Sequence, residues 1–140
     1  MANMTAEQVA AFIEGRKNAV LATLNPDGST QLSPVWYVMD GGKMYISTSN
    51  RSVKMRNLRR DPRISVCVEG GHGDFRYVTL SGRAEIVEHG EELQIRMRWR
   101  IIRSYHDSDA SAQAYADSTD DDTQVLIVLA PERTVARDYN

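Results

Sequence analysis

Residues 49–63 read Ser49-Asn50-Arg51-Ser52-Val53-Lys54-Met55-Arg56-Asn57-Leu58-Arg59-Arg60-Asp61-Pro62-Arg63, and they place six cationic side chains beside one acidic side chain. Ser52 suits a helix cap and Pro62 disfavours helical geometry at the preceding residue, so we predict a helix from about Val53 to Arg60. The first turn of that helix offers free main-chain N–H groups and a positive dipole end, and Lys54 adds a full charge. The stretch indicates a phosphate site or a solvated basic helix face, and the charge pattern alone favours neither.

Alternating apolar and polar residues predict strands on both sides of this helix. In 43–48, Met44 and Ile46 alternate with polar positions at the period of two that a half-buried strand requires. We expect six strands, at 19–24, 30–39, 43–48, 64–68, 75–87 and 124–130, the last continuing after Pro131 toward Val135. Tight turns at 25–28 and 40–42 join the first three into an antiparallel meander, and Gly82 marks a bulge or bend in the fifth.

This strand pattern predicts a mainly β protein with short flanking helices. Closing six antiparallel strands into a small barrel removes exposed sheet edges, and an open sandwich is the alternative. A capping box at 5–8 predicts an amphipathic helix that ends at Gly15, and a second helix is expected over about 91–102. We expect Cys67 at a buried strand position, and Asp117 with 120–122 in a solvated acidic loop.

Size and composition bound the classes of protein that fit. The chain has 140 residues and a mass of 15.8 kDa, so we expect a single domain spanning 1–140. The formal net charge is −2, which gives no reason to expect affinity for nucleic acid. The sequence shows neither a secretory signal nor an apolar run of the ~20 residues that span a membrane, so we expect a cytoplasmic protein without a membrane partner.

Motifs for metal, nucleotide and hydrolytic chemistry are missing from the sequence. The three histidines form no ligand-spaced pair and there is one cysteine, so we expect no metal site. The paired glycines match neither the Walker nor the dinucleotide fingerprint, and no nucleophile elbow is present. A protein with so little acid–base apparatus can still catalyse redox chemistry if a bound cofactor carries the reactive atom.

A family resemblance rests on the order of these motifs. The Pro-Asp-Gly turn, the strand Gln31-Leu32-Ser33-Pro34-Val35-Trp36-Tyr37 and the basic stretch with its run Asn57-Leu58-Arg59-Arg60-Asp61-Pro62-Arg63 resemble the pyridoxamine 5'-phosphate oxidase-like split β-barrel flavoproteins. The likeness spans nearly the whole chain and looks most like the branch that uses the deazaflavin coenzyme F420. It implies a six-stranded antiparallel split barrel that forms a homodimer, with a cofactor groove between the two subunits.

The resemblance also implies a set of cofactor-binding residues. The cofactor ring is expected along the strand at 33–36 and its phosphate at the turn at 49–54, with the groove completed by the neighbouring subunit. The implied residues are Ser33, Pro34, Val35, Trp36, Thr48, Ser49, Ser52, Lys54 and Asn57, with Phe75, Arg76 and Tyr77 from the neighbouring subunit. Ser52 departs from relatives that carry arginine there. No catalytic acid or base is assigned, and Trp36 and Tyr37 must point to opposite sides of their strand.

Three functions remain open at this level. The first is an F420-dependent oxidoreductase that transfers a hydride from reduced deazaflavin to an unsaturated small molecule. The second is an FMN-binding oxidoreductase of the same fold, and the third is a noncatalytic protein that binds the cofactor or a tetrapyrrole. Arg96, Arg100 and Arg103 share one helical face and would bind the anionic tail of F420 or an acidic substrate, or else form a solvated face. The sequence does not identify the physiological substrate.

Overall fold

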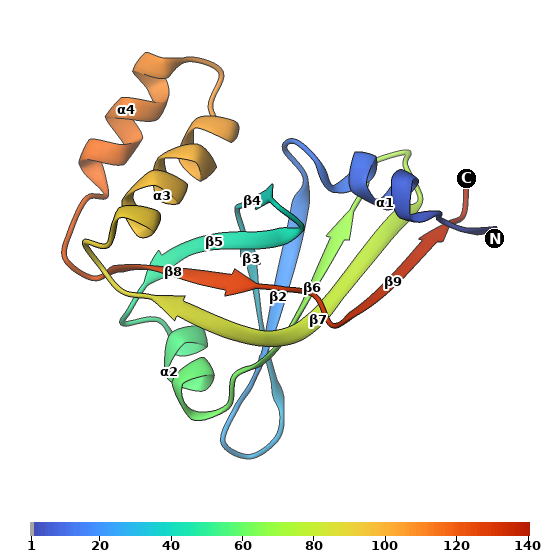
Figure 1. Cartoon of the computed structure of the whole chain (residues 1–140), viewed down its shortest axis with the longest axis horizontal. Coiled ribbons are helices and arrows are strands. Elements are labelled where there is room, and N and C mark those ends of the chain that lie inside the picture. The colour runs from blue at the N-terminus through green and yellow to red at the C-terminus, as the bar shows by residue number, and fades with distance from the viewer. Residues whose placement is uncertain (1) are drawn as a thin grey trace.

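A computed structural model describes residues 2–140, which form nine strands and four helices (Figure 1). In chain order the elements are β1 (Ala2–Asn3), α1 (Ala6–Ile13), β2 (Asn18–Leu24), β3 (Thr30–Val35), β4 (Tyr37–Asp40), β5 (Lys43–Ser49), α2 (Val53–Arg60), β6 (Arg63–Glu69), β7 (Arg76–Val87), α3 (Glu92–Ser104), α4 (Asp109–Ser118), β8 (Gln124–Leu129) and β9 (Arg133–Asp138). None of the helices in this described part is long and apolar enough to cross a membrane.

The strands form one curled antiparallel sheet, in the order β3-β2-β6-β7-β8-β5-β4, with β9 pairing to both β7 and β1. The long strand β7 links the two halves of this split barrel. Its residues up to Arg83 pair with β6, and its residues from Ala84 to Val87 pair with β8. Figure 1 shows β7 curving from the right of the view, beside β9, to the left, where it lies below β8. The predicted bend lies at this change of partner, where a Cβ on Gly82 would come within 3.0 Å of the Ala130 carbonyl oxygen.

The structure corrects the predicted number of strands from six to nine. The strand expected at 30–39 breaks at Trp36, so that β3 pairs with β2 while β4 pairs with β5. The last strand does not continue through Pro131, because the chain turns there and β9 pairs with β7. Both breaks occur where the sheet curls from one half to the other, which a linear pattern of apolar residues does not reveal. The two-residue β1 is too short to show a pattern.

Caps define the helix boundaries. In the predicted capping box, Thr5 Oγ1 accepts from the Gln8 main-chain N–H at 3.1 Å and Gln8 Oε1 accepts from the Thr5 N–H at 2.8 Å. The predicted bounds of α2 are confirmed, with Ser52 as its cap. The acidic loop is corrected, because Asp117 lies within α4, a helix that the sequence analysis did not predict. Its buried positions are alanines, too weakly apolar to give a clear periodicity.

The main core lies inside the curled sheet, where residues of β2, β5, β6, β7 and β8 meet under α1 and α2. Tyr37 is 1% exposed, and its hydroxyl donates to the Ile13 carbonyl at 2.7 Å, which ties β4 to α1. Burial raises the pKa of this phenol. A second cluster packs α3 against β5 and β8, and α4 packs against α3 and contacts Trp36 through Tyr115 (Figure 1). The helix pair α3–α4 therefore forms a cover at one end of the sheet.

Candidate functional site

A cleft of about 740 Å³ lies between the sheet and the α3–α4 cover. Its lining comes from the start of β2, the ends of β3 and β5, the first turn of α2, the start of β8, and the helices α3 and α4. The lining residues are Arg16, Lys17, Asn18, Ala19, Val20, Pro34, Val35, Trp36, Ser47, Thr48, Ser49, Lys54, Arg98, Ile101, Ile102, Tyr105, Tyr115, Thr119 and Gln124. The cleft therefore has four cationic residues and no acidic residue in its walls.

Lys54 is a half-buried cation at one end of this cleft. Desolvation by burial lowers its pKa below the ordinary value of 10.5. Among residues 2–140, no carboxylate lies within 4.0 Å of its amino group. The hydroxyl of the cap residue Ser52 accepts the Met55 N–H, at 3.3 Å. The N–H groups of Val53 and Lys54, in the first turn of α2, have no main-chain acceptor in residues 2–140. This arrangement fits an anion.

The remaining cations of 49–63 lie on the surface. Arg59 bonds Glu88 at 3.0 Å, Arg63 bonds Asp61 at 2.7 Å, and Arg60 donates to the Leu24 carbonyl. Arg51 and Arg56 are exposed as well. Of the six cations in this stretch, only Lys54 lines the cleft. Five of the six cations thus form the solvated basic face that the charge pattern allowed. The sixth, Lys54, lies in a cleft, which keeps the phosphate interpretation open for this residue.

Aromatic side chains form the wall of the cleft at the end of β3. The ring of Trp36, 37% exposed, stacks on Tyr105 with centroids 5.0 Å apart and planes 8° from parallel. Tyr115 of α4 contacts the same indole at 5.2 Å. The Tyr105 hydroxyl donates to the Lys17 carbonyl at 2.9 Å, which fixes α3 to the start of β2. Trp36 and Tyr37 point to opposite sides, as predicted, with Tyr37 in the core.

The α3 wall of the cleft was missed by the sequence analysis. Arg98, Ile101, Ile102 and Tyr105 line the cleft at the spacing of one helical face. The Arg98 guanidinium donates to the Ala116 carbonyl at 3.0 Å and to Thr119 Oγ1 at 2.8 Å. The sequence contains this helical spacing, but the sequence analysis considered only Arg96, Arg100 and Arg103 of this helix as ligand-binding residues.

Arg96, Arg100 and Arg103 do not line the cleft. Arg100 pairs with Asp40 at 3.1 Å, and Arg103 pairs with Asp109. Arg96 is exposed. These three arginines form a solvated face of α3, the second of the two possibilities that their spacing allowed.

Six of the predicted cofactor residues line the cleft together: Pro34, Val35, Trp36, Thr48, Ser49 and Lys54. Beside them, Ser33 Oγ is buried and is the one such side-chain atom in residues 2–140 that lacks a hydrogen-bond partner. Asn57 is buried away from the cleft, where its amide donates to Thr23 Oγ1 and Asn25 Oδ1, each at 3.0 Å. Ser52 and Asn57 therefore have internal partners that hold α2 in place.

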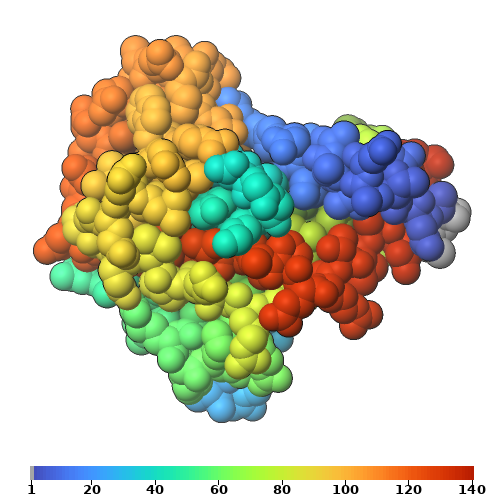
Figure 2. Space-filling view, in the orientation of Figure 1, coloured from blue at the N-terminus to red at the C-terminus, as the bar shows by residue number. Residues whose placement is uncertain are grey.

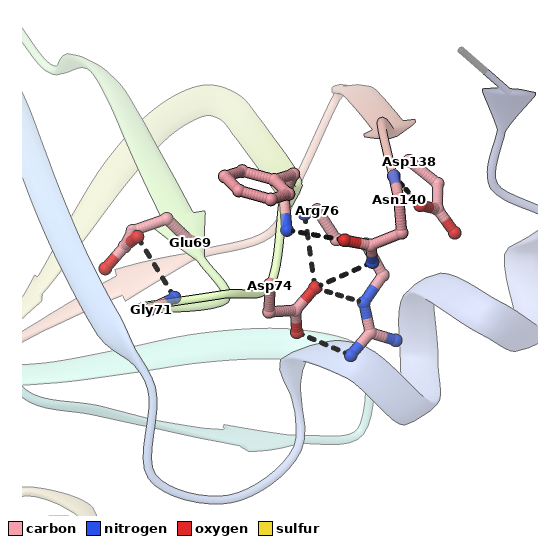
Figure 3. Close-up of polar contacts among 7 residues, drawn as sticks. Glu69, Gly71, Asp74, Arg76, Asp138 and Asn140 are labelled. Atoms are coloured by element: carbon pink, nitrogen blue, oxygen red, sulfur yellow. Dashed lines mark hydrogen bonds and ion pairs between the residues drawn. The ribbon is translucent and has the colours of Figure 1, made fainter.

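The predicted residues Phe75, Arg76 and Tyr77 line a different cleft, at the loop before β7. Figure 3 shows that the C-terminal residue holds this loop. Asn140 Nδ2 donates to Asp74 Oδ1 at 3.0 Å, and Asn140 Oδ1 accepts the Phe75 N–H at 2.9 Å. Arg76 bonds Asp74 at 2.6 Å and keeps the pKa of that carboxyl well below its usual range. Within one subunit the predicted site is thus divided between two clefts.

The donor set of the larger cleft fits a cofactor with a phosphate and a planar ring. Lys54, Ser49 and the first turn of α2 supply cationic and neutral donors for a phosphate. Pro34, Val35 and Trp36 supply an apolar wall for a ring, next to the unpartnered hydroxyl of Ser33. A ligand of this kind would supply a partner for the uncompensated charge of Lys54.

The lowered pKa of Lys54 predicts how anion binding depends on pH. The amino group is charged only below its pKa, which burial has lowered, so affinity for a phosphate-bearing flavin should fall with rising pH before an ordinary lysine would titrate. Calorimetric titrations between neutral and alkaline pH measure this fall. In Lys54→Arg, whose guanidinium stays protonated, the fall should disappear. An unchanged pH profile in this variant would contradict the assignment.

Comparison with known proteins identifies the family of this chain and solved structures with the same fold. A family model for pyridoxamine 5'-phosphate oxidase matches residues 5–137. The conserved hypothetical protein Rv2991 from Mycobacterium tuberculosis is 30% identical, with a TM-score of 0.81 over 96% of this chain and 85% of that chain.

Two further solved structures share the fold at lower identity. An F420 reductase is 22% identical, with a TM-score of 0.69 over 89% of this chain and 93% of its own. A FAD-binding protein from Mesorhizobium loti is 17% identical, with a TM-score of 0.71 over 99% of this chain and 98% of its own. The curled sheet, the cleft and the match over residues 5–137 together show that the chain belongs to the pyridoxamine 5'-phosphate oxidase family.

Proposed function

We propose that the protein is an F420-dependent oxidoreductase, which holds reduced deazaflavin in the cleft and transfers a hydride to an unsaturated small molecule. The observation that carries this proposal is Arg98, a cation that lines the cleft without an acidic partner. Arg98 contacts only neutral acceptors, the Ala116 carbonyl and the Thr119 hydroxyl, and Lys54 has no acidic partner either. Cations without acidic partners in one cleft favour a ligand with several negative groups.

We assign the anionic tail of the cofactor to Arg98, because Arg96, Arg100 and Arg103 lie outside the cleft. F420 carries carboxylates beyond its phosphate, whereas FMN ends at the phosphate. Hydroxyl and amide groups of Ser49, Thr119 and Gln124 line the cleft along with Lys54 and Arg98. Ser49 pairs with Gln124 across β5 and β8, and Thr119 bonds Arg98. This polar region suits an anionic tail that extends past the phosphate at Lys54.

The chain contributes binding and orientation to the reaction. The cofactor, when bound, supplies the hydride. Lys54 and Arg98 hold its anionic groups, and Pro34, Val35 and Trp36 form the wall along its ring. The α3–α4 cover screens the ring from water through the contact of Tyr115 with Trp36. With no acid or base assigned, correct placement of the two reactants supplies the catalysis.

A homodimer is part of the proposal, and the outer face of the sheet supports it. Two rows of paired residues cross the strands on this face. The first row consists of Pro34, Val20, Cys67, Thr79 and Val135 and carries no charge. The second row consists of Leu32, Ala22, Ser65, Ser81 and Arg133, and Arg133 is its one charged residue. Cys67 is therefore half-exposed on this face and not buried as expected. Val20 and Pro34 belong to both this face and the cleft, so a second copy packed here would wall the cleft.

Calorimetric titration of the protein with F420 and with FMN tests the proposal. We expect tighter binding of F420, and in Arg98→Gln an affinity for F420 about tenfold weaker, because one charge-assisted contact is lost. FMN affinity should not change in this variant, which also shows that the cleft stays folded. Arg96→Gln is the matched control on the exposed face of the same helix and should leave both affinities unchanged.

Each of the other functions predicts a different result. Tighter binding of FMN than of F420 would replace the proposal with a flavin oxidoreductase. Equal loss of both ligands in Arg98→Gln would mean that this arginine does not bind the tail. If the protein binds F420 but gives no turnover with reduced cofactor across a panel of conjugated substrates, it is a noncatalytic binding protein.

A further inference from the structure

A further concave surface lies between α1 and β9. It encloses about 500 Å³, a volume in the range of small-molecule sites. Leu80 of β7 forms part of its floor, and Ile13 and Met39 form part of its walls. In Figure 2 the yellow-green atoms of the β6–β7 region are visible at the bottom of a hollow between blue α1 and red β9.

The surface of this groove is mostly apolar. Met4, Val9, Ile13, Met39 and Leu80 supply aliphatic carbons and two flexible thioethers, which adapt to a chain of varied shape. Ile13 and Leu80 are also buried members of the main core, so the groove is continuous with the interior of the protein. An aliphatic chain in the groove would therefore contact rigid core side chains on one side.

The groove has one charged residue, and it is a cation. Arg137 lines the groove through β9, and its guanidinium donates only to the neighbouring Ala136 carbonyl, at 3.0 Å. No carboxylate of the described chain lies within 4.0 Å of it. The other polar lining residues, Asn3 and Thr134, are neutral. An apolar groove next to one unpaired guanidinium complements a molecule with an aliphatic chain and a single carboxylate.

Small residues of α1 keep the groove open. Ala6 and Ala10 line it and are exposed, so no large side chain covers the apolar floor from this helix. The next residue, Ala11, is also exposed but does not line the groove. The two neighbouring alanines thus differ in whether their side chains meet the proposed ligand.

We propose that this groove binds a medium-chain aliphatic monocarboxylate, with the chain along α1 and the carboxylate on the Arg137 guanidinium. The site is independent of the cofactor cleft, because the two share no lining residue. Calorimetric titration of the full-length protein with hexanoate, octanoate and decanoate tests this assignment. Each added methylene that is buried should strengthen binding about fourfold. Decanol, which lacks the charge, should bind about tenfold more weakly than decanoate.

Two pairs of variants locate the ligand. Ala10→Leu fills the groove and should abolish decanoate binding, whereas Ala11→Leu should leave it unchanged. Arg137→Gln should remove the preference for decanoate over decanol, whereas Arg133→Gln on the same strand should keep it. Affinity for F420 should be the same in all four variants, so this test can fail while the proposed function stands.

Some results would overturn the assignment. Affinity that does not increase with chain length, or that is the same in Ala10→Leu as in the unaltered protein, would exclude the groove as the binding site. If Ala10→Leu changes the mass of the protein in sedimentation and decanoate does not bind, the groove is a contact between copies of the chain.

Discussion

Replacement of Lys54 by alanine should weaken the binding of F420 about 30-fold, which corresponds to about 2 kcal/mol for a lost charge-assisted contact with a phosphate. The physical reason is the position of this amino group. It is half-buried at the end of the cleft, has a lowered pKa and has no carboxylate partner in residues 2–140. Removing it leaves the phosphate with only neutral donors from Ser49 and the first turn of α2. Calorimetric titration with F420 measures the change.

Lys43 provides the matched control for this prediction, because the other lysine, Lys17, itself lines the cleft. The chain has three lysines, and Lys43 lies at the exposed start of β5, outside the cleft. Lys43→Ala should leave the affinity for F420 unchanged, and Lys54→Arg should retain most of it at neutral pH. FMN should lose affinity in Lys54→Ala by a similar factor, because both cofactors have the same ribityl phosphate. Equal affinities in Lys54→Ala and Lys43→Ala would show that the phosphate binds elsewhere.

Replacement of Ile127 by alanine should lower the free energy of unfolding by about 3 kcal/mol, through lost burial and a cavity that the core closes only in part. Ile127 is 0% exposed in the middle of β8, where it pairs with Ile46 of β5 on one side and Ile86 of β7 on the other. It therefore lies at the junction of the two halves of the barrel. Urea unfolding at one fixed protein concentration measures the loss.

The same substitution at an exposed site is the matched control. Ile95 of α3 is 59% exposed, and Ile95→Ala should change the free energy of unfolding by less than about 0.5 kcal/mol. Because β5 also carries Ser47, Thr48 and Ser49 into the cleft, Ile127→Ala should weaken F420 binding in addition. A loss in unfolding free energy no larger than that of Ile95→Ala would mean that the core around Ile127 is not packed as described.

Much of the local structure was predictable because it depends on neighbours in the chain. The capping box at Thr5 and the bounds of α2 were predicted correctly, since caps and the residue before Pro62 act over only three or four positions. The helix α4 was not predicted, because its buried positions are Ala112 and Ala116, which become apolar contacts only when α3 lies beside them. The nine strands were counted as six for a related reason, since Trp36 and Pro131 interrupt strands only in a curled sheet.

The candidate site was predictable on one side of the cleft only. Lys54, Thr48 and the strand at 34–36 carry motifs of charge, turn and proline that the sequence displays, and the structure brings them together. Arg98, Tyr105 and Tyr115 come from helices distant in sequence, so their approach to β2 and β3 depends on how α3 packs on the sheet. Arg100 and Arg103, which the sequence analysis considered for the cofactor tail, bond Asp40 and Asp109 at the surface.

The sequence by itself determined a mainly β protein with a capped basic helix that carries Lys54, because these features arise from periodicity, capping and charge within short segments. Only the tertiary structure decided which cations lie in the cleft. It also placed Phe75 to Tyr77 at a separate cleft and opened an apolar groove beside Arg137. The physical reason is that burial and pairing of a side chain depend on segments far apart in the chain, which the sheet curls together through β7.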